Sequence, residues 1–250
     1  MRVVILGAGT AIPARSYSPA GIYVRIAREH VLLDAGPGTL QRLHVAGAPV
    51  QHLDRIFLTH FHLDHCLDLA SILFALRLPQ LKRRKPLTVY GPPGLARLYH
   101  RLNIAFQGWL SPRGFRVRFV ELQEARLRLR GYTVESRRMK HYRTRAIGYR
   151  LTSGGRSLAY SGDTDVCRGI VELGRNADAL LLECSMPCAR KVDGHLTPCD
   201  CGHIAADAGC RRLVLTHFYP VFAGVSISRC VRRSFRGPLT LARDFTSFAL

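Results

Sequence analysis

The segment Thr59–His65 concentrates the side chains of this 250-residue sequence that are best suited to binding metal ions. It follows the apolar run Ile56–Leu58 and contains four donors, which are His60, His62, Asp64 and His65. Neutral imidazole and carboxylate groups are ligands that zinc and similar divalent ions accept. One crowded turn cannot direct all four donors at a single ion. The spacing therefore predicts two metal ions whose remaining ligands come from elsewhere, although any one histidine taken alone would be interpreted as a surface residue.

Further candidate ligands follow apolar stretches elsewhere in the chain. His141 ends one predicted strand, Asp163 follows a second, and His217 ends a third. Loops at one edge of a sheet are where a scaffold displays its chemistry. Asp34 leaves another apolar strand and enters the Gly-rich segment Ala35–Gly38. In that position its carboxylate can orient a ligand histidine from behind, and helix capping is the alternative role.

Apolar periodicity predicts many short strands with helices between some of them. Strands are expected at residues 3–6, 21–26, 30–33, 54–59, 87–90, 116–122, 125–130, 132–139, 147–151, 157–161, 179–182 and 212–216, and helices at 39–46, 66–78, 94–106 and from 194–198 through 208. Two sheets packed face to face, with the helices outside, would bring the ligand-bearing strand ends together. The segment Gly7–Thr10 lacks the GxGxxG pattern, so a dinucleotide site is not expected.

Length and composition are consistent with one globular domain of residues 1–250. Such a chain can bury a substantial core, and 47% of its residues are hydrophobic. The sequence has no uncharged apolar stretch of about 18 residues, so we expect no membrane association. The N-terminal segment Met1–Gly7 resembles a strand and lacks the apolar region and cleavage site of a signal peptide. The cytoplasm is therefore the expected location.

The chain is strongly basic. Lys and Arg outnumber Asp and Glu by 37 to 17, which gives a net charge of +20. This surplus favours polyanionic partners, nucleic acid above all, although a basic proteome or a thermophile's Arg-rich surface would have the same composition. The basic residues gather at 82–85, 126–130 and 137–150. Arg126, Arg128 and Arg130 alternate with leucines, so we expect them on one face of a strand.

The eight cysteines are expected to be mostly free thiols in a reducing compartment. Cys184 and Cys188, together with Cys199 and Cys201, could form a structural zinc site or disulfides. However, neither spacing matches the common CxxC pairs. Scattered small hydrophobic residues are therefore the preferred interpretation.

The ordered motifs resemble those of the metallo-β-lactamase superfamily. They are Asp34, the segment His60-x-His62-x-Asp64-His65, His141, Asp163 and His217. Within the superfamily the sequence resembles ribonuclease Z-type phosphodiesterases, through Leu6–Pro13, Ile147–Arg150, Glu183, Gly194-His195 and Asp244–Phe248. This resemblance implies an α/β fold, the four-layered αββα sandwich.

The resemblance also implies roles for individual residues. His60, His62 and His141 would hold one ion, Asp64, His65 and His217 the other, and Asp163 would bridge them. The ions would be zinc, with manganese or iron as alternatives. Two ions about 3.5–4 Å apart can share a hydroxide and bind a phosphate in line with it. Asp64 would also orient or deprotonate the attacking water. His195, held by Glu183, would stabilise transition-state charge or protonate the leaving oxygen, and a plain position near the helix N-cap Thr197 is the alternative for His195.

The resemblance implies a metal-dependent hydrolase that cleaves phosphodiester bonds with a metal-bound hydroxide. Its substrate would be tRNA, other RNA, a cyclic nucleotide or a small diester. Two departures from the ribonuclease Z pattern affect the substrate. Only residues 151–159 separate Arg150 from Tyr160, where that family usually inserts a long tRNA-binding arm, and the basic loop after Pro13 is altered. The alternatives are hydrolysis of an ester, thioester or lactone at the same site and RNA binding with weak catalysis. The family also commonly forms homodimers.

Overall fold

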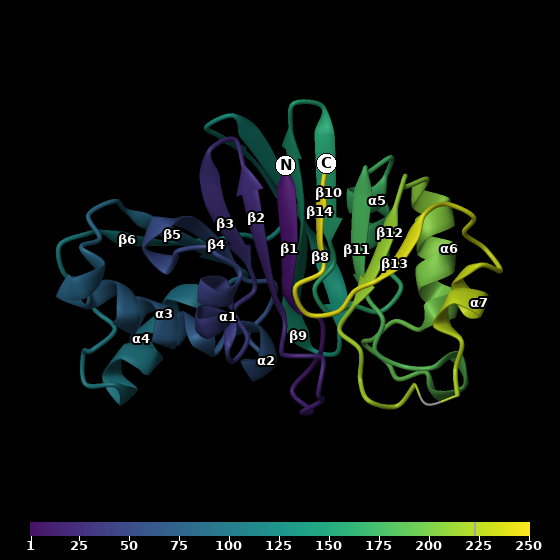
Figure 1. Ribbon diagram of the computed structural model, residues 1–250, viewed down its shortest axis with the longest axis horizontal. Helices are drawn as coiled ribbons and strands as arrows, with labels where there is room; N and C mark the ends of the chain where they lie inside the picture. Colours follow the sequence, from purple (N-terminus) through teal and green to yellow (C-terminus); the bar gives the residue numbers. More distant parts are fainter. Residues whose placement is uncertain (223) are drawn as a thin grey trace.

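In the computed structural model, which describes residues 1–222 and 224–250, two seven-stranded sheets pack face to face (Figure 1). The first has the order β14-β1-β2-β3-β4-β5-β6, with β1 at Arg2–Gly7, β2 at Gly21–Ile26, β3 at Glu29–Leu33, β4 at Leu53–Phe57, β5 at Leu87–Gly91, β6 at Val117–Glu121 and β14 at Ser247–Ala249. The second has the order β13-β12-β11-β10-β9-β8-β7, with β7 at Ala125–Leu129, β8 at Tyr132–His141, β9 at Thr144–Ser153, β10 at Arg156–Tyr160, β11 at Ala179–Glu183, β12 at Leu213–Thr216 and β13 at Leu239–Leu241.

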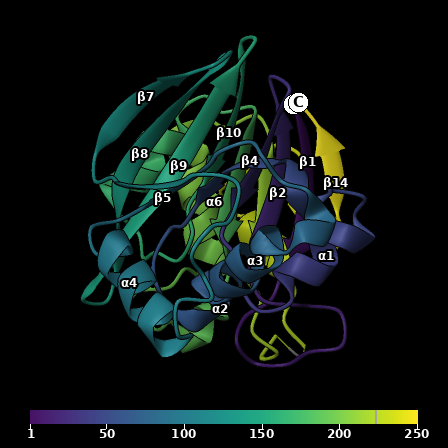
Figure 2. The same ribbon diagram turned by 90° about the vertical axis from the view of Figure 1, so that its left-hand side faces the viewer.

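Helices cover the outer face of each sheet. On the first sheet lie α1 (Thr39–Val45), α3 (Asp68–Arg77) and α4 (Leu95–Ala105), which stand in front of the strands in Figure 2, and the short α2 (Leu63–Cys66) precedes α3. On the second sheet lie α5 (Arg168–Gly174), α6 (Pro198–Ala208) and α7 (Ile227–Val231) (Figure 1). This arrangement confirms the predicted four-layered αββα fold.

Three hydrophobic cores hold the four layers together. The central core joins inward-facing side chains of both sheets, such as Val24 and Tyr149. A second core lies between the first sheet and its helices, and a third lies between the second sheet and α5, α6 and α7. Leu180–Leu182 are fully buried, as expected for a parallel strand covered on both faces.

Strand direction places the functional residues at one edge. The strands β3 and β4 are parallel, as are β10, β11 and β12, and β8 shares the direction of β10 because β9 is antiparallel to both. The carboxyl ends of these strands therefore point the same way within each sheet. The amide of Ile147 donates to the carbonyl of Thr59 at 3.0 Å, which joins the two sheets at this edge.

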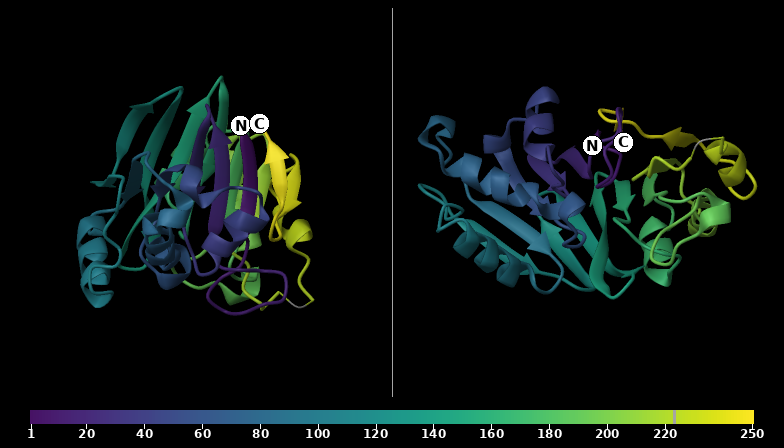
Figure 3. Two further views of the ribbon diagram at one scale, coloured as in Figure 1. Left: turned by 60° about the vertical axis from the view of Figure 1, so that its left-hand side comes forward. Right: turned by 90° about the horizontal axis from the view of Figure 1, so that it is seen from below.

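The chain termini lie together at the opposite end, where N and C are adjacent in Figures 1 and 3. The amino group of Met1 donates to the carbonyl of Leu250 at 2.8 Å. Among the described residues, no helix is both long and apolar enough to cross a membrane.

Several local predictions need correction. The predicted helix at 66–78 is instead two helices, α2 and α3, so Asp64 and His65 lie within helix α2 rather than before a helix. The helix α5 was not predicted, because its seven residues carry too little periodic signal. The Tyr132 strand continues to His141. Its extension places that histidine directly at the strand end.

The cysteine predictions are partly wrong. Cys188 is disulfide-bonded to Cys199, whereas Cys184 and Cys201 are free and buried. The four residues therefore do not form one site. The sequence could not separate them, because only the packing of α6 against the second sheet decides which sulfur atoms face inward.

Candidate metal centre

All seven predicted metal ligands lie together at the common edge of the two sheets. His60 follows β4, and Asp64 and His65 lie in α2. His141 ends β8, Asp163 follows β10 and His217 follows β12. Six of the seven are buried and His62 is exposed, so the group is open to solvent at the His62 side. Residues separated by up to 157 positions thus share one small volume.

The carboxylate of Asp163 stands between two groups of donors. Its Oδ1 lies 3.2 Å from His65 Nε2 and 3.4 Å from His217 Nε2. Its Oδ2 lies 3.9 Å from His60 Nε2 and 3.8 Å from His141 Nε2. Each oxygen atom therefore faces a different group, which is the arrangement of a bridging ligand between two cations.

Each group contains enough donors for one divalent ion. His60, His62, His141 and Asp163 each place a ligand atom within 4.8 Å of the others, as do Asp64, His65 and His217. Asp64 Oδ2 lies 3.5 Å from His217 Nε2. Within the described chain, His60 Nε2 and Asp163 Oδ1 are buried without a hydrogen-bond partner. Buried polar atoms are normally satisfied, and these nitrogen and oxygen donors are the types that zinc accepts, so the residues fit metal ions.

The predicted orienting role of Asp34 has a clear geometric basis. Its Oδ2 lies 2.8 Å from His65 Nδ1, which leaves Nε2 free to face Asp163. Asp34 also accepts hydrogen bonds from the amide and hydroxyl of Thr59 and from the hydroxyl of Tyr160. It does not cap a helix. Such outer contacts fix the ring orientation of a metal-binding histidine.

The other three buried histidines have comparable outer partners that the sequence analysis did not identify. Thr59 Oγ1 lies 3.0 Å from His60 Nδ1. His141 Nδ1 lies 2.8 Å from the carbonyl oxygen of Gly194, and His217 Nδ1 lies 3.0 Å from Ser185 Oγ. The only sequence signal for Ser185 was its proximity to Glu183, and Gly194 was named only as part of the Gly194-His195 motif. Each ring thus turns its free nitrogen toward the shared space.

Burial and neighbouring charges shift the pKa values of several donors. Burial opposes ionisation of Asp64, but the hydrogen bond with His217 and the charge of His65 lower its pKa to about 2. Burial lowers the pKa of His60 well below its usual value, so this ring is neutral. Burial also opposes protonation of His65, yet Asp163 and Asp34 raise its pKa well above the usual value.

His195 and Glu183 form a buried pair beside these groups. His195 Nδ1 lies 2.9 Å from Glu183 Oε1 and 4.0 Å from Asp163 Oδ2. Glu183 also accepts a hydrogen bond from the amide of Thr164 and one from the hydroxyl of Ser185. Burial opposes protonation of His195, but the hydrogen bond and charge of Glu183 raise its pKa. The raised pKa favours a protonated His195, and its Nε2 has no hydrogen-bond partner within the described part of the chain.

Aromatic rings flank His195. The ring centroids of Tyr142 and Tyr219 lie 5.7 and 6.1 Å from that of His195. Tyr142 is 55% exposed, so its face is open to a ligand. Neither tyrosine was predicted from the sequence, although each lies within two residues of a predicted ligand, His141 or His217.

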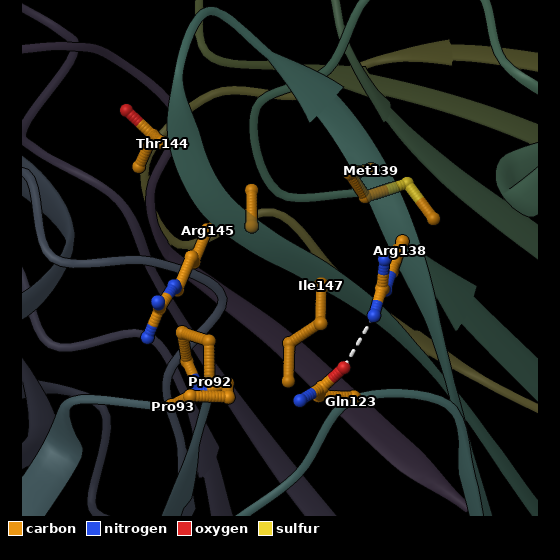
Figure 4. Close-up of a pocket in the computed structure, with 9 residues that line it drawn as sticks. Pro92, Pro93, Gln123, Arg138, Met139, Thr144, Arg145 and Ile147 are labelled. Atoms are coloured by element: carbon orange, nitrogen blue, oxygen red, sulfur yellow. Dashed lines mark hydrogen bonds between the residues drawn. The ribbon is translucent and has the colours of Figure 1, made fainter.

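A cavity of about 360 Å³ lies next to the facing segments of β8 and β9 (Figure 4). Its lining includes Pro92, Arg138, Thr144 and Arg145, and Arg138 donates a hydrogen bond to Gln123. Thr144 Oγ1 lies 3.4 Å from His62 Nε2. The cavity therefore adjoins the donor group of His60, His62, His141 and Asp163. Two guanidinium groups at this position make the cavity attractive to anions.

Comparison with known proteins identifies the family. Residues 29–218, well over half of the chain, match the β-lactamase superfamily domain. The chain belongs to this superfamily. Membership, together with the two histidine–aspartate groups, makes it a metal-dependent hydrolase.

Relatives within the superfamily include ribonucleases. The chain is 27% identical to the ribonuclease Z of Methanosarcina mazei, with 87% of each chain covered. The human tRNase Z, short form, superimposes with a TM-score of 0.81 at 26% identity, covering 100% of this chain and 99% of that one. The metallo-β-lactamase fold protein YhfI from Bacillus subtilis has a TM-score of 0.86 at 22% identity, covering 99% and 98%. The YhfI match shows the common fold.

The Methanosarcina mazei enzyme differs from this chain by inserted residues. Its alignment with the Methanosarcina mazei enzyme extends over 273 residues yet covers 87% of this 250-residue chain, so that enzyme contains residues that this chain lacks. In the structure, β9 and β10 are joined by the two-residue turn Gly154-Gly155. Ribonuclease Z-type enzymes usually carry the tRNA-binding arm at this position, and the short turn confirms that no long insertion lies here.

Proposed function

We propose that this superfamily member is a phosphodiesterase of the ribonuclease Z type with two divalent metal ions. The observation that carries the proposal is the pair of donor groups sharing Asp163, with the His195–Glu183 pair beside them. One ion would be held by His60, His62, His141 and Asp163, and the other by Asp64, His65, His217 and Asp163. Zinc matches these donors, and manganese and iron are the alternatives. When bound, such ions supply an activated water near neutral pH and neutralise charge on a phosphate.

The chain's own residues would perform the remaining steps. Asp64 is ionised, and the amide of Ala11 fixes its Oδ2 at 3.1 Å. Asp64 can therefore accept a hydrogen bond from the attacking water and orient it. His195 donates one ring proton to Glu183 and keeps the other on Nε2, where it can be passed to the leaving oxygen.

The surroundings of the site favour a nucleotide as substrate. Arg138 and Arg145 line the cavity beside His62, at a position suited to a phosphate next to the one that is cleaved. The exposed ring of Tyr142 beside His195 can stack on a base. The net charge of +20 favours a polyanion, and the relatives named ribonuclease Z and tRNase Z support RNA as that substrate.

The test is turnover of two substrates by metal-loaded protein: bis(4-nitrophenyl) phosphate and a precursor tRNA with a 3′ trailer. We expect both to be cleaved, and Asp163→Ala to abolish both activities because it removes the shared ligand. Asp207→Ala, an exposed aspartate on α6, is the matched control. Absence of both activities in metal-loaded protein would refute the proposal. Cleavage of the small diester alone would restrict the substrate to small phosphodiesters.

A further inference from the structure

A second group of potential metal ligands lies outside the catalytic centre. The sulfur atoms of Cys188, Cys199 and Cys230 lie within 4.8 Å of one another. They come from three elements: the 3-10 helix Cys188–Arg190, the first turn of α6, and α7. All three residues are half-buried, so their sulfur atoms are within reach of solvent.

We propose that the reduced protein binds one additional zinc ion through Cys188, Cys199 and Cys230. Zinc–sulfur bonds of about 2.3 Å in a tetrahedral site place sulfur atoms roughly 3.8 Å apart. The three sulfur atoms already lie within 4.8 Å of one another, and Cys188 and Cys199 separate once their disulfide is reduced. A disulfide between Cys188 and Cys199 leaves Cys230 without a role, whereas a metal ion uses all three sulfur atoms.

The structure also suggests a fourth ligand. His203 lies four residues after Cys199 in α6 and is exposed. Side chains four residues apart in a helix lie on the same face, with Cβ atoms about 5–6 Å apart. Gly202 packs against Val231, the residue after Cys230, so α7 lies beside this part of α6. The ring of His203 lies outside the group of three sulfur atoms, and a rotation of its side chain would be needed to complete a Cys3His set, which is a common composition for structural zinc.

The remaining cysteines differ from this group. Burial raises the pKa of Cys66 and that of Cys210 to about 12, and burial also keeps the Cys201 thiol protonated by raising its pKa. Zinc binds the thiolate form. Arg190 and Arg229 lie within two residues of Cys188 and Cys230 in the sequence.

Zinc binding and the disulfide exclude each other. Reduction of the Cys188–Cys199 bond by a phosphine or thiol adds two electrons and two protons and yields two thiols, and the reductant is oxidised. Each thiol then loses its proton on binding the ion. The bound ion would fasten the segment that leads from Cys188 to Gly194 and His195 onto α6 and α7.

Cobalt substitution tests the proposal independently of catalysis. Cobalt bound to thiolates has a ligand-to-metal charge-transfer absorption, whereas the catalytic donors contain nitrogen and oxygen only. Protein reduced with a phosphine and loaded with Co²⁺ should show this band. Cys230→Ser should lose it and bind one fewer zinc per chain, while Cys167→Ser, a half-buried free cysteine at the N-terminus of α5, should keep both.

Retained turnover of bis(4-nitrophenyl) phosphate would show that Cys230→Ser is folded, and the band itself does not depend on that turnover. Absence of the thiolate band in reduced wild type, or its persistence in Cys230→Ser, would overturn the site. His203→Ala should weaken zinc binding there about tenfold or more, whereas His100→Ala, an exposed histidine on α4, should not. Unchanged affinity in His203→Ala would remove His203 from the ligand set.

Discussion

At the scale of single residues, His195 could act as the general acid or could position the metal centre. If His195 protonates the leaving oxygen, its loss should matter only where that oxygen is a poor leaving group. The 3′ oxygen of a nucleotide needs a proton, whereas 4-nitrophenolate leaves without one. General acid catalysis is worth about 10²–10⁴-fold.

We therefore predict that His195→Ala lowers the rate of precursor tRNA cleavage by about 100-fold or more. The same substitution should lower turnover of bis(4-nitrophenyl) phosphate by less than about tenfold. Single-turnover rates on both substrates measure the difference, with His100→Ala as control. An equal loss on the two substrates would mean that His195 positions the metal centre and is not the acid.

At the scale of elements, two site residues that follow strands have an unfavourable backbone conformation. Asp34 and His217 have φ of 57° and 60°, values that are costly for residues other than glycine. Hydrogen bonds from neighbouring elements hold them there: the amide of Asp34 donates to Phe57 in β4, and the amide of Phe218 donates to Ala8 after β1. Neighbouring elements thus hold both residues in a conformation that is uncommon outside glycine.

Gly162, which follows β10, packs closely against Thr59, which follows β4. It has φ of 59°, and a Cβ atom there would lie 2.6 Å from Thr59 Cβ, displacing the side chain that contacts Asp34 and His60. We predict that Gly162→Ala lowers the free energy of unfolding by about 2–4 kcal/mol, combining left-handed strain with overpacking. It should also weaken metal binding.

Gly154→Ala is the control for this experiment. Gly154 has φ of 56° but open space around it, so its substitution adds strain without a clash. Its effect should be limited to about 1–2 kcal/mol, with metal affinity unchanged. Denaturant titration and metal titration compare the variants, and equal losses at the two positions would show that contact with Thr59 is unimportant.

His30, in the β2–β3 hairpin, should make the stability of the fold depend on pH. Burial, followed by the charges of Arg25 and Lys85, lowers the pKa of His30 to about 4. The unfolded chain takes up this proton near pH 6.5, so stability is present above that pH and is lost as the pH falls toward 4. Tyr23 Oη lies 2.7 Å from His30 Nδ1 and keeps the ring in place.

Between pH 7.5 and 4.5, wild type should lose about 1–2 kcal/mol more unfolding free energy than His30→Gln, after allowing for solvent screening of a half-buried ring. Urea titrations at several pH values measure the difference. His100→Gln should behave as wild type. Parallel losses in wild type and His30→Gln would exclude a neutral, buried His30.

At the scale of the whole molecule, the charge of +20 predicts salt-dependent binding of RNA. The logarithm of the association constant should fall linearly with the logarithm of salt concentration. Arg145→Ala, in the cavity beside His62, should reduce the slope by about one and weaken binding of every sequence similarly. Arg2→Ala, at the other end of β1 from the site, is the control. A slope unchanged in Arg145→Ala would exclude a phosphate contact there.

Other properties of the whole molecule stay predictions. They are a single domain of residues 1–250, a location in the cytoplasm and a homodimer. Light scattering tests the homodimer.

The sequence by itself determined the superfamily and the types of the donor residues. The superfamily follows from the resemblance of the ordered motifs. The donor positions follow from local features, since apolar runs predict strands and the polar residues after them lie at strand ends. His60, His141, Asp163 and His217 could all be identified in this way. The distinction between β-strand and loop needs only neighbouring residues, and the resemblance to the superfamily then implied the fold class.

Only the tertiary structure decided how these residues combine. The division of the Asp163 oxygens between two groups, the contact of Ser185 with His217 and the meeting of Cys188 with Cys230 join segments far apart in the chain. Such contacts depend on the relative position of packed sheets and helices, which no local pattern contains. The chain therefore encodes its chemistry locally, but the distances that make that chemistry possible arise from packing.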